Sequence, residues 1–158
     1  MKNMKKLLYL LLLLPLGFLA SCSDDDDLPA VEVTVNIDNA VDSNGHLYIV
    51  SGEPLTVQSI NVESLNGKAT GISGVNYVLD HVGLGYNIVS PFGAQINPAY
   101  LPVGNHLFTL SFDVLQVDKS IAYAQLSTIV TVVESAEDLP DGATPGTVTL
   151  HYNLNPKQ

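Results

Sequence analysis

The sequence has one cysteine, no tryptophan and no arginine among its 158 residues. Three of its six lysines lie within the first six residues, so from residue 22 onwards three lysines face sixteen acidic residues, a net charge of −13. Nucleic acid is excluded as a partner because binding a phosphate backbone requires a basic surface. A single cysteine also forms no disulfide within the chain, so the fold depends on packing alone.

The first 21 residues have the pattern of a cleaved secretory signal. Lysines precede an apolar run over residues 7–20, which is shorter than the roughly 20 residues that a membrane-spanning helix needs. The run ends in Leu19, Ala20, Ser21 and Cys22, which resembles the lipobox of bacterial lipoproteins. The resemblance implies cleavage before Cys22 and a lipid on its thiol, so that the mature N-terminus is held in a membrane. The alternative is a secreted chain with one unpaired thiol.

An acidic segment follows the cysteine directly. Its side chains repel one another and cannot pack, so residues 22–30 are expected to form at least a solvated tether. The segment also resembles the acidic export signal that follows the lipidated cysteine in surface lipoproteins of the Bacteroidetes type. This resemblance implies a location in the outer membrane facing the medium, and the residues that match the signal are Ser23, Asp24, Asp25, Asp26 and Asp27.

After residue 30 the apolar residues recur with a period of two, which is typical of half-buried β-strands. The buried face of the first expected strand carries Val31, Val33, Val35 and Ile37. Asn44 and Gly45 suit the positive φ angles of a tight turn. In residues 55–62 the apolar positions change parity, which predicts a β-bulge near Ser59.

Two shorter strands are expected in residues 74–82 and 85–92, separated by Gly83 and Gly85. The glycine-rich stretches at residues 71–74 and from Gly83 onwards lack the spacing of a nucleophile elbow and of a dinucleotide-binding loop. Both stretches are therefore expected to be ordinary loops.

The longest alternating segment runs over residues 102–135 and predicts two strands around a turn at residues 118–120. The side chains expected to be buried on the two strands are Phe108, Leu110, Phe112, Val114, Leu126, Val130 and Val132. The start of the segment resembles the closing hairpin of bacterial immunoglobulin-like and polycystic-kidney-disease-like sandwich domains. The residues that match are Pro102, Gly104, Asn105, His106 and Leu107.

The resemblance covers roughly residues 31–133 and implies an all-β fold, an immunoglobulin-like antiparallel β-sandwich of about seven to eight strands after a cleaved lipoprotein signal peptide. Since the chain lacks the cysteine pair and the tryptophan of antibody domains, Tyr77 is expected to take the central aromatic position. The expected divisions are a signal peptide (1–21), a lipidated acidic tether (22–30), the sandwich (31–134), an acidic loop (135–146), and a C-terminal strand and tail of the same domain (147–158).

No arrangement of catalytic residues is recognisable in the sequence. The four histidines, on different expected strands, lack the short spacings of metal ligands: His46, His81, His106 and His151. Asp80 and His81 are neighbours on an expected strand and so should point to opposite faces. The oxygen-rich residues 38–45 lack the spacing of a calcium-binding loop, and calcium binding there stays open. We expect no enzyme activity, no metal site and no cofactor.

The expected function is a non-catalytic binding or adhesion module at the cell surface, with a glycan or a protein as its ligand. Phe92 and Tyr100 lie on a long expected loop, where aromatic rings suit the faces of sugars. The alternative is that these rings cap the core, and the lack of tryptophan weakens the case for a glycan. The other candidate is a structural or assembly subunit of an outer-membrane complex, which pairs with its partner through an exposed strand edge.

Overall fold

The protein is described by a computed structural model that covers residues 27–155. The expected signal peptide lies outside the described residues, as do Cys22, Ser23, Asp24, Asp25 and Asp26. Asp27 is described and exposed, and its carbonyl accepts a hydrogen bond from the backbone N–H of Ser120. Between residues 27 and 155 no helix has the length and apolar character needed to cross a membrane.

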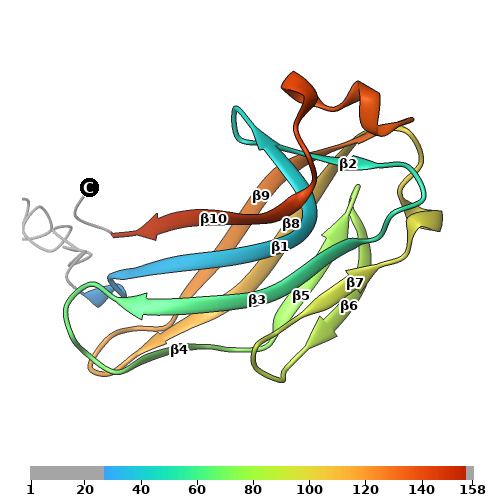
Figure 1. Cartoon of the computed structure of the whole chain (residues 1–158). Helices are drawn as coiled ribbons and strands as arrows, with labels where there is room; N and C mark the ends of the chain where they lie inside the picture. The colour runs from blue at the N-terminus through green and yellow to red at the C-terminus, as the bar shows by residue number, and fades with distance from the viewer. Residues whose placement is uncertain (1–26, 156–158) are drawn as a thin grey trace, which may run out of the picture.

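Two β-sheets make up the fold (Figure 1). The first contains, in spatial order, β10 (Gly146–Leu154), β1 (Val31–Ser43), β3 (Leu55–Ser64) and β7 (Ala94–Ile96). The second contains β6 (Val82–Asn87), β5 (Val75–Leu79), β8 (Gly104–Gln116), β9 (Ala122–Val133) and β2 (His46–Val50), with the short β4 (Thr70–Ile72) beside β8. Neighbouring strands are antiparallel except for the parallel pair β2 and β9.

This arrangement confirms the expected β-sandwich. The chain crosses between the two sheets several times, and the last three residues of β1 pair with β2 and so link the sheets. The described residues form ten strands, more than the seven to eight expected. Three short 3₁₀ helices lie between strands: η3 (Pro98–Tyr100), η4 (Ala136–Asp138) and η5 (Pro140–Gly142).

Two local predictions about β1 and its neighbours are confirmed. Asn44 and Gly45 have φ angles of 54° and 78° and form the two-residue turn between β1 and β2. Asn36 pairs with Ser59 while Ile37 pairs with Val57, so one extra residue bulges from β3 where the parity of the apolar positions changes.

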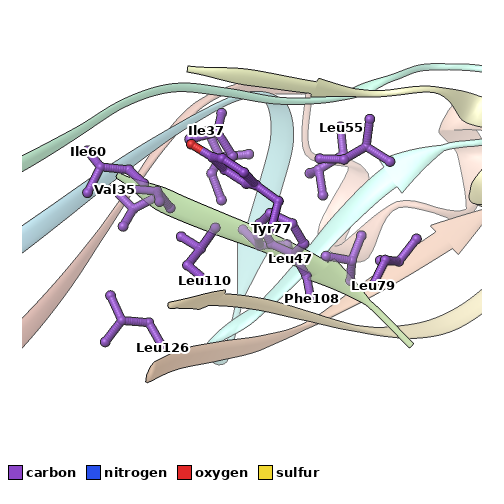
Figure 2. Close-up of a cluster of buried hydrophobic side chains, with 14 of the residues drawn as sticks. Val35, Ile37, Leu47, Leu55, Ile60, Tyr77, Leu79, Phe108, Leu110 and Leu126 are labelled. Atoms are coloured by element: carbon purple, nitrogen blue, oxygen red, sulfur yellow. The ribbon is translucent and has the colours of Figure 1, made fainter. Parts of the chain in front are cut away.

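The core lies between the sheets and contains the alternate residues of each strand (Figure 2). Tyr77, which is 2% exposed, takes the central aromatic position, and its ring stacks on Phe108 with 6.5 Å between ring centroids. The Tyr77 hydroxyl donates a hydrogen bond to the carbonyl of Phe92. Burial raises the pKa of Tyr77 to about 12, so this hydroxyl stays protonated and keeps donating.

The strand boundaries expected in residues 74–92 are wrong. β5 and β6 are joined by Asp80 and His81, with φ angles of 47° and 69°, and Gly83 and Gly85 lie within β6, not in a loop. Aspartate and histidine tolerate the left-handed region better than most residues. Asp80 is further held there because its carboxylate accepts the backbone N–H of Leu107 at 2.8 Å.

Two other expected loops contain regular structure. In residues 71–74, the first two residues belong to β4. The segment from Pro91 to Gly104 contains η3 and the strand β7, which pairs with β3. Within residues 135–146 lie η4 and η5, after which β10 pairs with β1 along its length, with Val148 opposite Ile37 and Leu154 opposite Val31.

Candidate functional site

Three tyrosines stand out because their side chains are mostly exposed. Tyr86, Tyr100 and Tyr123 have exposed fractions of 64%, 63% and 66%. Three hollows adjoin them: Tyr86 lines two, and Tyr123 lines one of these two and a third that lies beside Leu154. An exposed ring offers a flat apolar face and a hydroxyl group at its tip, a combination that suits binding surfaces. The two hollows that Tyr86 lines are therefore the candidate sites.

The first hollow lies on the outer face of the second sheet and has a volume of about 270 Å³. It is lined by residues from four strands and the segment between β4 and β5: Ser73, Gly74, Asn76, Tyr86, Ser111, Phe112, Asp113 and Tyr123. The lining strands follow the order β6, β5, β8 and β9, so the two tyrosines are separated by three strand spacings, about 14 Å across the strands. Tyr123 is also displaced by two residues along the strands, because the row that contains Tyr86 continues through Ser111 to Gln125. We call this hollow the tyrosine hollow.

Strand register brings these side chains to one face. Asn76 is opposite Tyr86 on one side and Ser111 on the other, while Asp113 is opposite Tyr123. Because side chains alternate along a strand, the residues between them point inward, and Tyr77 and Phe112 are buried in the core. The core residues thus fix which side chains face the hollow.

The polar groups on the floor of the tyrosine hollow are free to bind a ligand. Within residues 27–155, the side chains of Asn76, Ser111 and Asp113 make no hydrogen bond to the protein. Ser73, in contrast, is fully used, since its hydroxyl accepts the Asp113 N–H at 2.9 Å and donates to the carbonyl of Gly74. This contact fixes the segment before β5 against β8 and so shapes one wall.

Gly74 lets the Tyr86 ring lie against the backbone. A Cβ atom at this position would be 2.5 Å from the Tyr86 hydroxyl oxygen and 2.7 Å from Cγ2 of Ile88. Any residue other than glycine would therefore displace these side chains. The Tyr86 ring can occupy this position only because Gly74 has no Cβ atom.

The second hollow lies between β6 and β7, at an edge of the sandwich, and has a volume of about 280 Å³. Tyr100 lines this hollow, whereas Phe92 is half-buried against the core, as the alternative interpretation predicted. Polar groups here already have partners: Asn87 bonds to the carbonyl of Gly93 and the N–H of Val89, and the Asn97 side chain accepts the N–H of Ala99. The edge hollow thus offers a ligand fewer free groups than the tyrosine hollow.

Asp80 and His106 form a contact that the sequence did not predict, in which the His106 ring is buried and the Asp80 carboxylate is half exposed. Nδ1 of His106 is 2.7 Å from the Asp80 carboxylate, and Nε2 is 2.7 Å from the carbonyl oxygen of Pro102. Burial by itself lowers the pKa of His106, but the Asp80 carboxylate and the Pro102 carbonyl outweigh it and raise this pKa. Nε2 faces a carbonyl, which has no proton to give, so His106 has no nucleophile to activate here. The geometry instead suits a structural role, in which His106 connects Asp80 to Pro102.

The other histidines lie apart from one another. His46 and His81 are exposed at turns, and His151 on β10 is 2.9 Å from Glu32 on β1. Of the oxygen-rich residues 38–45, Asp42 accepts the N–H of Gly45 and Asp38 accepts the hydroxyl of Thr147. In the described part of the chain no group of three or more His, Cys, Asp and Glu side chains is placed to hold a metal ion.

Part of the tyrosine hollow was visible in the sequence. Once Leu126 and Val130 are taken as inward, parity places Tyr123 outward, and an outward aromatic residue is a signal for a binding surface. Asp113 follows by the same argument from Phe112. Tyr86 was missed because the strand around it was divided at the wrong residues.

No protein-family model matches the chain, and no curated protein matches it significantly. Among solved structures, the chain is similar to the fibronectin(III)-like modules of Clostridium thermocellum CbhA, with 18% sequence identity. The match covers 61% of this chain and 96% of that chain, with a TM-score of 0.38. A similarity of this degree carries no information about ligands.

Proposed function

We propose that this protein is a lipid-anchored, cell-surface β-sandwich that binds neutral carbohydrate in the tyrosine hollow. The observation that carries the proposal is the set of unpaired polar side chains between two exposed tyrosines. Sugar rings have apolar faces that lie against aromatic rings and hydroxyl groups at their edges. The hollow offers both kinds of partner together.

Each lining residue has a chemical role in this proposal. Tyr86 and Tyr123 supply flat faces for the sugar rings, while the Asp113 carboxylate accepts hydrogen bonds from hydroxyl groups. Asn76 donates and accepts, and the Ser111 hydroxyl does the same on the floor. The volume of about 270 Å³ is just below the roughly 300–1,000 Å³ of sites for drug-sized ligands, so one sugar unit fits within it.

Charge restricts the ligand class to neutral glycans. Asp113 lies in the hollow, and the chain from residue 22 onwards carries a net charge of −13. Uronic acids and sulfated sugars are repelled by a negative field of this kind. Neutral hexose and pentose polymers meet no such penalty.

A binding experiment tests the proposal with hexasaccharides of glucose, mannose and xylose as probes and an oligogalacturonate as the anionic comparison. Isothermal titration of the full chain should detect at least one neutral probe and not the anionic one. Tyr86→Ala and Tyr123→Ala should each weaken binding at least tenfold, about 1.4 kcal/mol. Tyr100→Ala is the matched control, since Tyr100 is equally exposed but lies outside the tyrosine hollow. Equal binding by Tyr123→Ala and the native chain would contradict the site.

The anchoring part of the proposal is supported by the lipobox-like residues 19–22 and the apolar run before them. Cys22→Ala removes the thiol that accepts the lipid. Metabolic labelling with a fatty-acid analogue should tag the native chain and leave this variant unlabelled. Equal labelling of both chains would show that Cys22 is not the anchor.

A further inference from the structure

β10 forms one end of the first sheet, and its outer edge carries no strand within residues 27–155 (Figure 1). The N–H and C=O groups along such an edge that point away from the sheet have no strand partner, which makes them a template for another strand. β10 is nine residues long, and its pairing with β1 is regular from Val148 to Leu154. The edge is therefore long and straight enough to accept a complete strand.

Edge strands usually carry features that prevent such pairing, and β10 lacks them from Val148 to Leu154; the one irregularity in its pairing with β1 lies before this segment, between Gly146 and Val148. Its sequence GTVTLHYNL contains no lysine, aspartate, glutamate or proline. The strands at the other ends of the sheets differ: β7 has only three residues, β6 has two glycines and lies beside a bulge in its pairing with β5, and β2 pairs with the end of β1. Short length, bulges and charge are the common protections of an edge.

The outward side chains of β10 are held toward β1, on the side away from the free edge. The Thr149 hydroxyl donates to Asn36 at 2.8 Å, and the Thr147 hydroxyl donates to Asp38 at 3.2 Å. His151 contacts Glu32 at 2.9 Å. These bonds hold the side chains of β10 in place. The acidic groups nearest to the edge, Asp38 and Glu32, lie on β1 and are bonded to β10, so they do not face an incoming strand.

We propose that β10 pairs with β10 of a second copy of this chain, antiparallel and about a two-fold axis at Leu150. In this register Thr149 is opposite His151 and Val148 is opposite Tyr152. Thr147 is opposite Asn153, so apolar residues meet apolar residues and polar residues meet polar ones. A two-fold axis closes the assembly at two copies, and the first sheets of both join into one.

A single pair of edge strands buries little surface, so the dimer is weak and depends on concentration. Sedimentation velocity of the purified full chain should show a dimer at concentrations on the order of 100 μM and a monomer at on the order of 1 μM. Thr149→Lys adds the charge that edges usually carry and should remove the dimer, with a circular dichroism spectrum like that of the native chain. A native chain that stays monomeric at the higher concentration would overturn the proposal.

Cysteine cross-linking tests the register independently of dimer strength. The chains Thr149→Cys and His151→Cys are mixed, because opposite residues in antiparallel strands have Cα atoms about 4.5–5.5 Å apart, within disulfide range. The mixture should form a disulfide-linked dimer at least tenfold faster than a mixture of Thr147→Cys and His151→Cys, which this register holds apart. The native chain measures the background from Cys22. Equal rates in the two mixtures would exclude this pairing.

Discussion

The imidazole of His106 is bonded to the carboxylate of Asp80, 26 residues earlier in the chain, and this contact ties the β5–β6 turn to the start of β8. The second ring nitrogen faces the carbonyl of Pro102. Both nitrogens therefore face acceptors, and only the protonated imidazolium can donate to both. The hydrogen bond from His106 lowers the pKa of Asp80, with a further contribution from the N–H of Leu107 that opposes the effect of burial.

This pair predicts how stability depends on pH. The pKa of His106 is raised above its usual 6.5, so its contribution is complete below pH 6.5 and is lost as the pH rises through the raised value. The pKa of Asp80 is lowered below 3.8, so its contribution is complete above pH 3.8 and is lost as the pH falls through the lowered value. The pair should therefore stabilise the fold most between about pH 4 and 6.5.

Urea unfolding of His106→Leu measures this contribution. At pH 5.5 the variant should lose about 1–3 kcal/mol, because the Asp80 carboxylate and the Pro102 carbonyl lose their donor. The loss should shrink toward pH 9. Asp80→Asn removes the other member of the pair, and its loss of stability should shrink toward pH 9 in the same way. A loss that is constant across this range would mean that His106 acts only through its shape.

The core makes a prediction about β8. Phe112 is 2% exposed, and Phe112→Ala should lower the free energy of unfolding by about 3–5 kcal/mol. Val117→Ala is the control, since Val117 lies just beyond the end of β8 and is 54% exposed, and its loss should stay within about 0.5 kcal/mol. Similar losses for the two variants would contradict the assigned faces of β8.

Gly74 allows the tyrosine hollow to be altered without removing any of its side chains. Gly74→Ala should displace the Tyr86 ring and weaken binding of a neutral hexasaccharide at least tenfold. Stability should change by less than about 1 kcal/mol, because the two side chains that must move, Tyr86 and Ile88, are both exposed. Gly71→Ala is the matched control, since a Cβ there has no atom within 4 Å, and it should bind like the native chain. Unchanged binding by Gly74→Ala would mean that the Tyr86 ring does not form the site.

The alternation of apolar residues predicted the strands and their buried faces, and the resemblance of the segment from Pro102 to sandwich domains implied how the strands pack. In β1 the alternation placed four side chains in the core, and in β3 its change of parity located the bulge. The end of β5 was not predictable in this way, because Asp80 and His81 adopt positive φ angles that glycine adopts more easily. That turn is stabilised by the hydrogen bond from the N–H of Leu107 to the Asp80 carboxylate. The residues around Asp80 do not indicate a contact with a residue 27 positions away.

The tyrosine hollow was less predictable than the core, for a related reason. Parity identifies an outward residue, but which outward residues become neighbours depends on strand order and register. Asn76 and Ser111 lie opposite each other only because β5 pairs with β8. Likewise, Asp80 and His106 were separate features of the sequence until the same pairing brought them together.

The acidic residues after Cys22 make the last prediction, which concerns location. If Asp24 to Asp27 serve only as a tether, replacing them with serine and glycine should leave the location unchanged, because a linker of serine and glycine can serve as a tether too. If they form an export signal, the lipid should still attach at Cys22 while the protein stays on the periplasmic side. Under both interpretations the replaced variant stays attached to a membrane, and they differ only in the side of the membrane that the variant faces.

Protease treatment of intact cells distinguishes the two sides. Under the export interpretation the native chain should be digested and the replaced variant protected, while fatty-acid labelling of the two stays equal. The matched control for charge also removes four acidic residues that lie after β9, far from the N-terminus in sequence, by replacing Glu134, Glu137, Asp138 and Asp141 with serine. This control should be digested like the native chain. Digestion of the variant that lacks Asp24 to Asp27 would mean that these aspartates serve only as a spacer. Protection of the native chain would contradict the surface location itself.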